Sequence, residues 1–128
     1  MSTKSLRRSF GYALCGIATT LRSGRNARIQ LAIAVAVVVL AFFLRVSRGE
    51  WAVLIVTIGL VLAAEAINTA IEGVVDLLSP EHHARAKVAK DVAAGAVLVA
   101  AIAAAIVGLL ILGPPLYEWL IQSPPAVQ

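Results

Sequence analysis

The stretch WAVLIVTIGLVLAAEAINTAIEGVVDLLSP, residues 51–80, decides the fold, because it begins as a membrane helix and ends in carboxylates. Its first half is apolar and uncharged, and Ser79-Pro80 marks its end because proline does not continue a helix. At about 1.5 Å per residue, such a helix is longer than the ~30 Å of hydrocarbon in a bilayer. One end must therefore emerge from the hydrocarbon.

The polar side chains of this stretch follow a helical spacing. At about 100° per residue they fall within roughly 80° of one another, with Thr69 at the edge of the group. The column consists of Glu65, Asn68, Glu72 and Asp76. Neutral polar residues commonly bond between membrane helices, but ionised groups near the hydrocarbon cost several kcal/mol and mark functional sites. The column therefore predicts a site, with Glu65 the deepest residue in it.

The composition of the whole chain places it in a membrane. Of its 128 residues, 60% are hydrophobic and only 14% are charged, and the mean hydropathy is +0.91. Soluble domains are nearer half apolar and a quarter charged. One domain of this size cannot bury so much apolar surface in its own core. We therefore expect an all-α integral membrane protein.

Four helices are expected from the apolar pattern. Residues 5–21 carry one apolar stripe interrupted by arginines, which predicts an amphipathic helix lying on the bilayer surface. Three transmembrane helices are then expected at about 29–46, 51–78 and 92–112. The last is rich in alanine and glycine, which allow close helix packing. Residues 1–112 would form a single membrane domain, and 113–128 a proline-rich extracytoplasmic tail.

The basic residues predict the orientation. The chain carries a net charge of +4, with six of its eleven lysines and arginines before the first span, three between the second and third, and two between the first and second. This asymmetry is the positive-inside pattern. It places the N-terminus and residues 80–91 in the cytoplasm. It also accounts for the basic charge without a nucleic acid partner.

The acidic column, together with a lysine, indicates phosphoryl-transfer chemistry. Lys90 precedes the third span and would reach the height of Glu72 and Asp76 if the two helices are antiparallel neighbours. Carboxylate oxygens suit Mg²⁺, and an ammonium group suits phosphate oxygens. Glu65, deeper and drier, suits a general base acting on a hydroxyl that arrives from the bilayer. We expect the metal at Glu72 and Asp76 and the base at Glu65.

A family resemblance is carried by the segment EAINTAIEGVVDLLSPEHHARAKVAKDVAAGAV, residues 65–97, and by GYALCG and RNARIQ upstream. The segment resembles the signature E-x-x-N-[ST]-A-I-E-x-x-x-D, followed by a short loop and A-K-D, of the small prokaryotic diacylglycerol kinase and undecaprenol kinase family. The likeness extends to about residue 112. It implies a homotrimer with shared active sites that transfers the γ-phosphoryl group of ATP to a lipid hydroxyl.

The resemblance also implies a role for each matching position. Glu65 matches the catalytic base, Glu72 a metal ligand, and Asn68 and Asp76 other polar residues of the active site, beside Thr69. The positions implied at the nucleotide are Tyr12, Glu81, His82, His83, Lys90 and Asp91, with Glu72 through the metal.

Two positions depart from the family pattern. Gly24 stands before RNAR where the family often has a glutamate that helps to bind the metal, and Cys15 stands where a lysine often follows the GY pair. The metal site would then depend on Glu72 and Asp76 with water, and Glu81 is a further candidate.

Two questions stay open at the level of sequence. Diacylglycerol and undecaprenol both place a hydroxyl near the headgroup plane, so either could be the acceptor. A small proton-coupled multidrug-type transporter is the alternative function, since such proteins are of similar length and use an intramembrane glutamate. Transporter carboxylates belong near the midplane of repeated or discontinuous helices, whereas this column runs to the surface and the chain shows no internal repeat.

Overall fold

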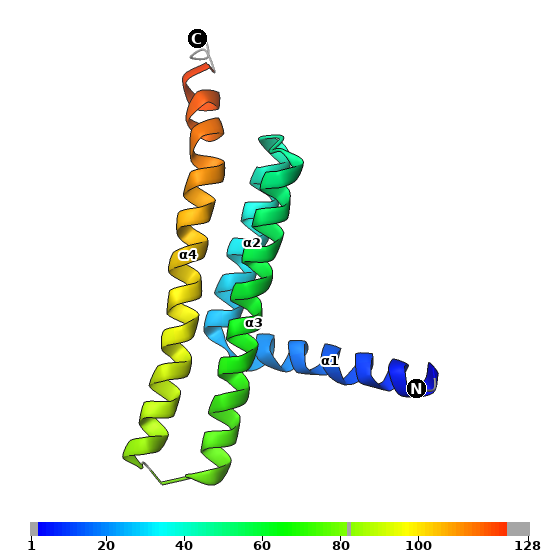
Figure 1. Ribbon diagram of the computed structural model, residues 1–128, viewed down its shortest axis with the longest axis vertical. Helices are drawn as coiled ribbons and strands as arrows, with labels where there is room; N and C mark the ends of the chain where they lie inside the picture. The colour runs from blue at the N-terminus through cyan, green and yellow to red at the C-terminus, as the bar shows by residue number, and fades with distance from the viewer. Residues whose placement is uncertain (1–2, 82, 123–128) are drawn as a thin grey trace.

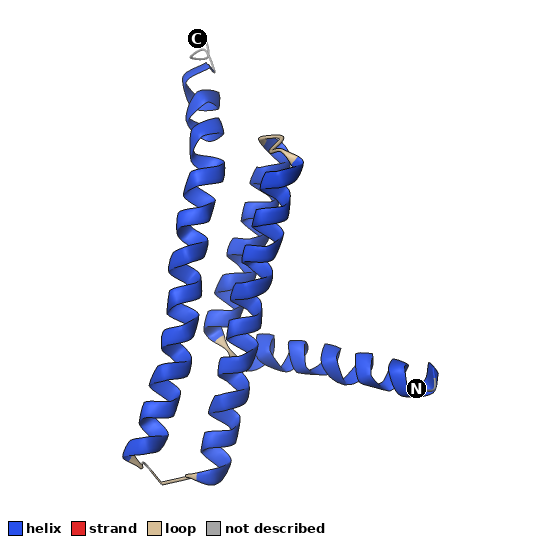
Figure 2. Cartoon of the chain, in the orientation of Figure 1, coloured by secondary structure: helices blue, strands red, loops and turns tan. Residues whose placement is uncertain are grey.

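The computed structural model describes residues 3–81 and 83–122, which form four helices. They are α1 (Thr3–Ser23), α2 (Arg25–Phe43), α3 (Arg48–Leu78) and α4 (Ala84–Gln122). The helices α2, α3 and α4 run side by side as an up-and-down bundle, and α1 extends away from the side of the bundle (Figure 1). Only helices and short connections are seen in the described part of the chain (Figure 2).

Three of these helices, α2, α3 and α4, are long and apolar enough to cross a membrane. The expected helix over 5–21 is confirmed as α1, and a helix covers each expected span. The first span was predicted to end at residue 46, but α2 ends at Phe43. The position of α1 on a bilayer surface, the limits of the bilayer and the trimer stay predictions.

The turns between helices follow from local chemistry. At the end of α2, the Val46 N–H donates to the Ala41 carbonyl and the Arg45 N–H to the Phe42 carbonyl, each at 3.3 Å. This pair of bonds is a Schellman cap, and Arg45 takes the left-handed conformation (φ 54°) that glycine usually supplies. Ser47 then begins α3 with a capping box, because its hydroxyl accepts from the Glu50 N–H and the Glu50 carboxylate accepts from the Ser47 N–H.

Gly24 makes the sharp corner between α1 and α2. Its N–H donates to the Thr20 carbonyl at 3.0 Å, and Ala27 packs directly beneath it. A Cβ at this position would lie 3.1 Å from the Thr20 carbonyl oxygen and 3.3 Å from the Ala27 Cβ. The close approach explains why a residue without a side chain occupies the corner.

The bundle is held by a seam of small and aliphatic residues. The buried residues of α2 recur every seventh position, which keeps them on one side of the helix. The buried aliphatic positions are Ala27, Ala34 and Ala41 on α2, Leu54 and Val61 on α3, and Ala93, Ala100 and Leu112 on α4. Most large apolar side chains face outward instead, so the surface of the bundle is apolar as well.

The unequal helix lengths create a projection at one end. A helix of 31 residues (α3) is about 18 Å longer than one of 19 residues (α2), at 1.5 Å per residue. Because a short turn joins the two helices at the other end, the last twelve residues of α3 extend beyond the start of α2. Figure 1 shows this end of α3 continuing past α1 together with the start of α4. We call residues 67–78 and 84–95 the hairpin arm.

The end of the last helix differs from the prediction. The expected stop at Gly113-Pro114 is wrong, because α4 continues through Pro114 and Pro115 to Gln122, so residues 113–122 are helical and not a tail. Each proline removes one helical hydrogen bond, but its φ angle suits a helix. Packing beyond the prolines favours the helix, since the Trp119 ring contacts Phe43 edge to face at 5.5 Å between centroids. Residues 123–128 lie outside the described residues.

Candidate active site

The predicted polar column lies along one side of α3 and passes from a buried to an exposed position. Glu65 is only 4% exposed, Asn68 and Thr69 are half-buried, and Glu72 and Asp76 are exposed. Glu65 stands at the level where α2 begins, and the other members stand on the hairpin arm. The column therefore connects the buried bundle with the surface of the arm.

Glu65 is a buried carboxylate with an unsatisfied oxygen. Among the described residues, no group hydrogen-bonds its Oε1 atom, although that atom is fully buried. The nearby Thr69 hydroxyl donates its hydrogen bond to the Glu65 backbone carbonyl at 3.0 Å, so it does not donate to the Glu65 carboxylate. An unsatisfied buried polar group lowers the free energy of unfolding by about 1–3 kcal/mol. The arrangement therefore indicates that Glu65 has a functional role and does not stabilise the fold.

Asn68 lies between Glu65 and Glu72 along α3 and hydrogen-bonds Glu72. Its Nδ2 group donates to the Glu72 Oε1 atom at 3.1 Å, which orients that carboxylate. Its own Oδ1 atom is buried and, within residues 3–81 and 83–122, has no hydrogen-bond partner. Two unsatisfied acceptors thus lie one helical turn apart, and both could accept a hydrogen bond from a hydroxyl group.

An ion pair joins the two sides of the arm. The Lys90 ammonium contacts the Asp76 carboxylate across the α3–α4 hairpin. This contact confirms that the two helices are antiparallel neighbours and that Lys90 reaches the height of the acidic column. Both side chains are partly exposed, which keeps them accessible to a charged ligand from water.

A second ion pair was missed by the sequence analysis. Lys87 pairs with Asp91 one turn further along α4, so the predicted Asp91 has its own lysine partner. The i, i+4 spacing of the two residues was the available signal. The arm consequently presents two ammonium groups and two paired carboxylates.

The remaining residues that were predicted to contact the nucleotide are exposed or take part in hydrogen bonds of the loop before α4. The His83 Nδ1 atom accepts from the Arg85 N–H at 3.2 Å, as a cap at the start of α4 does. Glu81 is exposed, and its carbonyl accepts from the Ser79 hydroxyl at 2.8 Å. Tyr12 is 76% exposed on α1, which points away from the arm (Figure 1). His82 lies outside the described residues.

The residues available for a metal ion are few. In the described part of the chain, no three acidic, histidine or cysteine side chains gather as a metal site. Glu72 and Asp76 nevertheless lie one turn apart on the exposed side of α3. Mg²⁺ is commonly bound by one or two carboxylates together with substrate phosphates and water, so this pair fits a metal that arrives with a nucleotide.

The chain is similar to known proteins over most of its length. The model of the family described as prokaryotic diacylglycerol kinase matches residues 11–112, a range that contains every predicted site residue. The chain is 45% identical over 109 residues to the undecaprenol kinase of Bacillus subtilis, covering 85% of this chain and 89% of that protein. It is 46% identical over 114 residues to a diacylglycerol kinase of Synechocystis, covering 88% of this chain and 65% of that protein.

A third relative is the diacylglycerol kinase of Pseudomonas aeruginosa, 38% identical over 97 residues, with 76% of this chain and 79% of that protein covered. The residues matched by the family model begin within α1 and end within α4. The chain therefore belongs to the prokaryotic diacylglycerol kinase family and is a phosphotransferase that uses an alcohol acceptor.

Proposed function

We propose that this protein is a multi-pass membrane lipid kinase that transfers the γ-phosphoryl group of ATP to the hydroxyl of a membrane lipid in the presence of Mg²⁺. The observation that carries the proposal is Glu65, a buried carboxylate with a free oxygen at the inner end of an apolar bundle. A hydroxyl arriving from the bilayer and a phosphate arriving from water would meet at this level.

In this proposal Glu65 is the general base. Its Oε1 atom accepts the proton of the lipid hydroxyl while the hydroxyl oxygen forms a bond to the γ-phosphorus. The bond between that phosphorus and the β–γ bridging oxygen breaks, so the products are a phosphorylated lipid and ADP. A base held in a site that excludes water avoids transferring the phosphoryl group to water instead. The Asn68 Oδ1 atom gives the same hydroxyl a second acceptor with which to align.

The hairpin arm binds the nucleotide in this proposal. Lys90 leaves Asp76 for the phosphate oxygens, and Lys87 and Asp91 stand beside it on α4. Glu81, His82 and His83 in the connecting loop, together with Tyr12 from α1, are proposed to contact the rest of the nucleotide. Positioning and charge stabilisation supply most of the catalysis in such transfers.

Glu72 and Asp76 are the residues proposed to hold Mg²⁺. When bound, the ion would neutralise phosphate charge. The asparagine amide that hydrogen-bonds Glu72 keeps one carboxylate oxygen engaged and leaves the other for the metal. Gly24 at the α1–α2 corner has no side chain that could bind the metal. A side chain at this position would fit only if the neighbouring residues moved, because the packing around Gly24 is tight.

The proposal includes the assembly and the orientation. The outward-facing apolar side chains of α2, α3 and α4 need lipid or other copies of the chain around them, and a homotrimer would cover part of this surface. The distribution of lysines and arginines supports an orientation with the N-terminus and the arm in the cytoplasm. The protein would then lie in the bacterial inner membrane, with α1 on its cytoplasmic surface.

Two lipids are proposed as acceptors, because the relatives at 45% and 46% identity are named for undecaprenol and for diacylglycerol. The test is transfer of radiolabel from γ-labelled ATP to each lipid in mixed micelles, with and without Mg²⁺. Label in one lipid only, dependent on Mg²⁺, supports the proposal and identifies the acceptor. Folded protein that labels neither lipid would refute the proposal.

A further inference from the structure

Asp76 and Lys90 bind each other across the α3–α4 hairpin, although the proposed function assigns each of them to a different ligand. Asp76 is proposed to hold Mg²⁺, and Lys90 is proposed to bind phosphate oxygens. A carboxylate oxygen that contacts an ammonium group is not available to a metal ion, and an ammonium group held by a carboxylate has fewer donors for phosphate. The ion pair and the two ligands therefore compete for the same atoms.

The other two carboxylates of the hairpin arm are engaged as well. Lys87 pairs with Asp91, and the Glu72 Oε1 atom accepts a hydrogen bond from a side-chain amide of α3 at 3.1 Å. Among the residues that the structure describes, no three acidic, histidine or cysteine side chains are gathered to hold a metal ion. Each carboxylate of the arm is thus bound by a group of the protein, and Asp76 becomes a metal ligand only after Lys90 has moved away.

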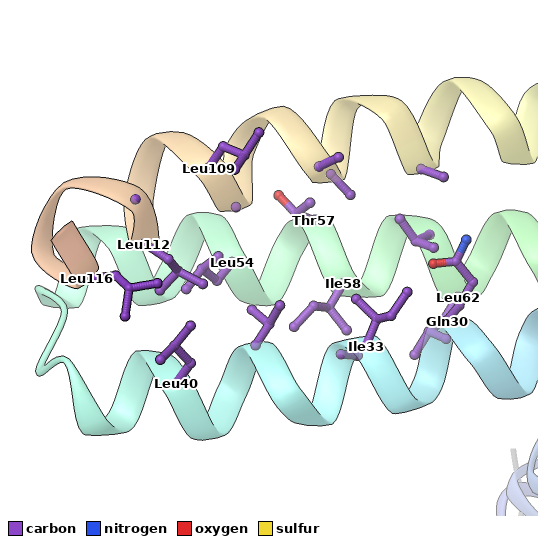
Figure 3. Close-up of a pocket in the computed structure, with 18 residues that line it drawn as sticks. Gln30, Ile33, Leu40, Leu54, Thr57, Ile58, Leu62, Leu109, Leu112 and Leu116 are labelled. Atoms are coloured by element: carbon purple, nitrogen blue, oxygen red, sulfur yellow. The ribbon is translucent and has the colours of Figure 1, made fainter. Parts of the chain in front are cut away.

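Lys90 can leave Asp76 by a movement of its side chain. The ammonium group is carried on a flexible stem of four carbons, and the side chains of Lys90 and Asp76 are 39% and 66% exposed. The interior of the bundle is a poor destination for the charge. A cavity of about 580 Å³ lies there between α2, α3 and α4, and among its described lining residues only Gln30 and Thr57 are polar (Figure 3). The ammonium group therefore moves toward the water around the arm, where a phosphate would arrive.

The opposite charges of the pair distinguish ligands that arrive together from ligands that arrive alone. A metal ion alone would displace Lys90 and leave an ammonium group beside a dication. A polyphosphate alone would attract Lys90 and leave the Asp76 carboxylate beside a polyanion. Like charges would face each other in both cases, which is unfavourable. When the metal ion and the phosphate arrive as one complex, the carboxylate and the ammonium group each keep a partner of opposite charge.

We propose that the Asp76–Lys90 ion pair selects the metal–nucleotide complex over the free metal ion and over the free nucleotide. The pair opens when a ligand supplies an opposite charge to each of its two members. This inference rests on the proposed function, since it concerns the phosphoryl donor of the same reaction. It gives Lys90 a second role, because the lysine prevents Asp76 from binding a metal ion in the absence of a nucleotide.

The alternative is an ion pair that only holds the two helices together. Ion pairs between partly exposed side chains contribute little to stability. The helices α3 and α4 also pack through buried residues further along the bundle, among them Val61 and Ala100. The two roles predict different results when the lysine is removed. Loss of a structural pair changes stability alone, whereas loss of a selective pair raises the affinity for a metal ion.

The metal half of the inference can be tested by Mn²⁺ binding to the purified protein in detergent micelles without nucleotide, measured from the electron paramagnetic resonance signal of free Mn²⁺. We expect Lys90→Met to bind Mn²⁺ about two- to fivefold more tightly than the unaltered protein, which is the factor that a partly exposed ion pair supplies. Lys87→Met is the matched control, because it removes the same charge from the same helix but releases Asp91, which is not a proposed metal ligand. The control should change the Mn²⁺ affinity by less than about 1.5-fold, since salt screens its more distant charge.

The nucleotide half predicts a gain in the opposite variant. Asp76→Asn releases Lys90 and should bind ATP in the presence of a chelator about two- to fivefold more tightly than the unaltered protein does, measured by equilibrium dialysis. The double variant Asp76→Asn/Lys90→Met should lose both gains, because it lacks the carboxylate for the metal ion and the ammonium group for the phosphate. Both single variants are expected to gain binding, and a variant that fails to fold cannot produce such a gain.

Equal Mn²⁺ affinities of the Lys90→Met and Lys87→Met proteins would overturn the inference, since Lys90 would then act through net charge alone. An unchanged or lower Mn²⁺ affinity of Lys90→Met would leave the pair with a structural role only. A Mn²⁺ gain that persists in the double variant would exclude Asp76 as the ligand, and an Asp76→Asn protein without a gain for metal-free ATP would refute the nucleotide half. An unaltered protein that phosphorylates no lipid would refute the proposed function itself, and the two binding measurements do not depend on turnover.

Discussion

Replacing Glu65 by glutamine separates the catalytic use of this residue from its structural cost. Glutamine keeps the shape of the side chain but cannot accept the proton of a hydroxyl. Loss of a general base typically costs 10²–10⁴-fold in rate, about 3–5 kcal/mol of transition-state stabilisation. The free Oε1 atom is buried, and a buried unsatisfied group costs about 1–3 kcal/mol. Glutamine keeps an acceptor oxygen there, but burying a neutral amide costs less than burying an ionised carboxylate, so the variant should be as stable as the unaltered protein or more stable.

The assay for Glu65→Gln combines kcat in mixed micelles, ATP binding and the midpoint of thermal unfolding in detergent. We expect kcat to fall at least 100-fold, ATP affinity to stay within twofold, and the unfolding midpoint to stay or rise. Glu118→Gln, an exposed carboxylate near the end of α4, is the matched control and should change none of these. A Glu65→Gln enzyme with more than a tenth of normal kcat would refute the assignment of the base. A strongly lowered midpoint would refute the argument about its structural cost.

Three further predictions concern the arm and the turn between α2 and α3. Glu72→Gln should raise the Mg²⁺ concentration for half-maximal activity at least tenfold, because one proposed ligand is lost; an unchanged Mg²⁺ titration would move the metal elsewhere. A double-mutant cycle of Asp76→Asn and Lys90→Met, measured by unfolding, should give a coupling free energy of about 0.2–1 kcal/mol, because the ion pair is partly exposed. A coupling free energy above 2 kcal/mol would contradict a weak surface ion pair. Arg45→Gly should raise the free energy of unfolding by about 0.5–1 kcal/mol, because the strain of a non-glycine residue at φ 54° exceeds the backbone entropy that glycine loses on folding. A lowered unfolding midpoint would show instead that the arginine side chain stabilises the turn.

The sequence predicted those features that depend on one helix at a time. The spacing of Glu65, Asn68, Glu72 and Asp76 is a property of a single helix, and their common side of α3 follows from it directly. The position of Lys90 opposite Asp76 was predictable because a short connection leaves two helices few alternatives to antiparallel packing. The charge pattern likewise depends only on the order of residues along the chain.

The features that the sequence did not predict depend on contacts between helices. Continuation of α4 beyond Pro115 is favoured by the contact of Trp119 with Phe43, and residues 43 and 119 are far apart in the chain. The cavity between α2, α3 and α4 needs the relative placement of three helices. The distance of Tyr12 from the arm depends on the direction in which α1 leaves the bundle.

The corner at Gly24 gives the protein a fixed reference depth in its membrane. With α1 on the cytoplasmic surface as proposed, the corner sets the height of Glu65 relative to the headgroups on that side. In a thicker or thinner bilayer, the membrane boundary on the side away from the cytoplasm would then shift relative to the α2–α3 turn and the last turns of α4. Each ångström of hydrophobic mismatch costs only a fraction of a kcal/mol. In that arrangement the position of Glu65 relative to the cytoplasmic leaflet would not change with bilayer thickness. Turnover that varied steeply with acyl length in reconstituted bilayers would contradict this separation.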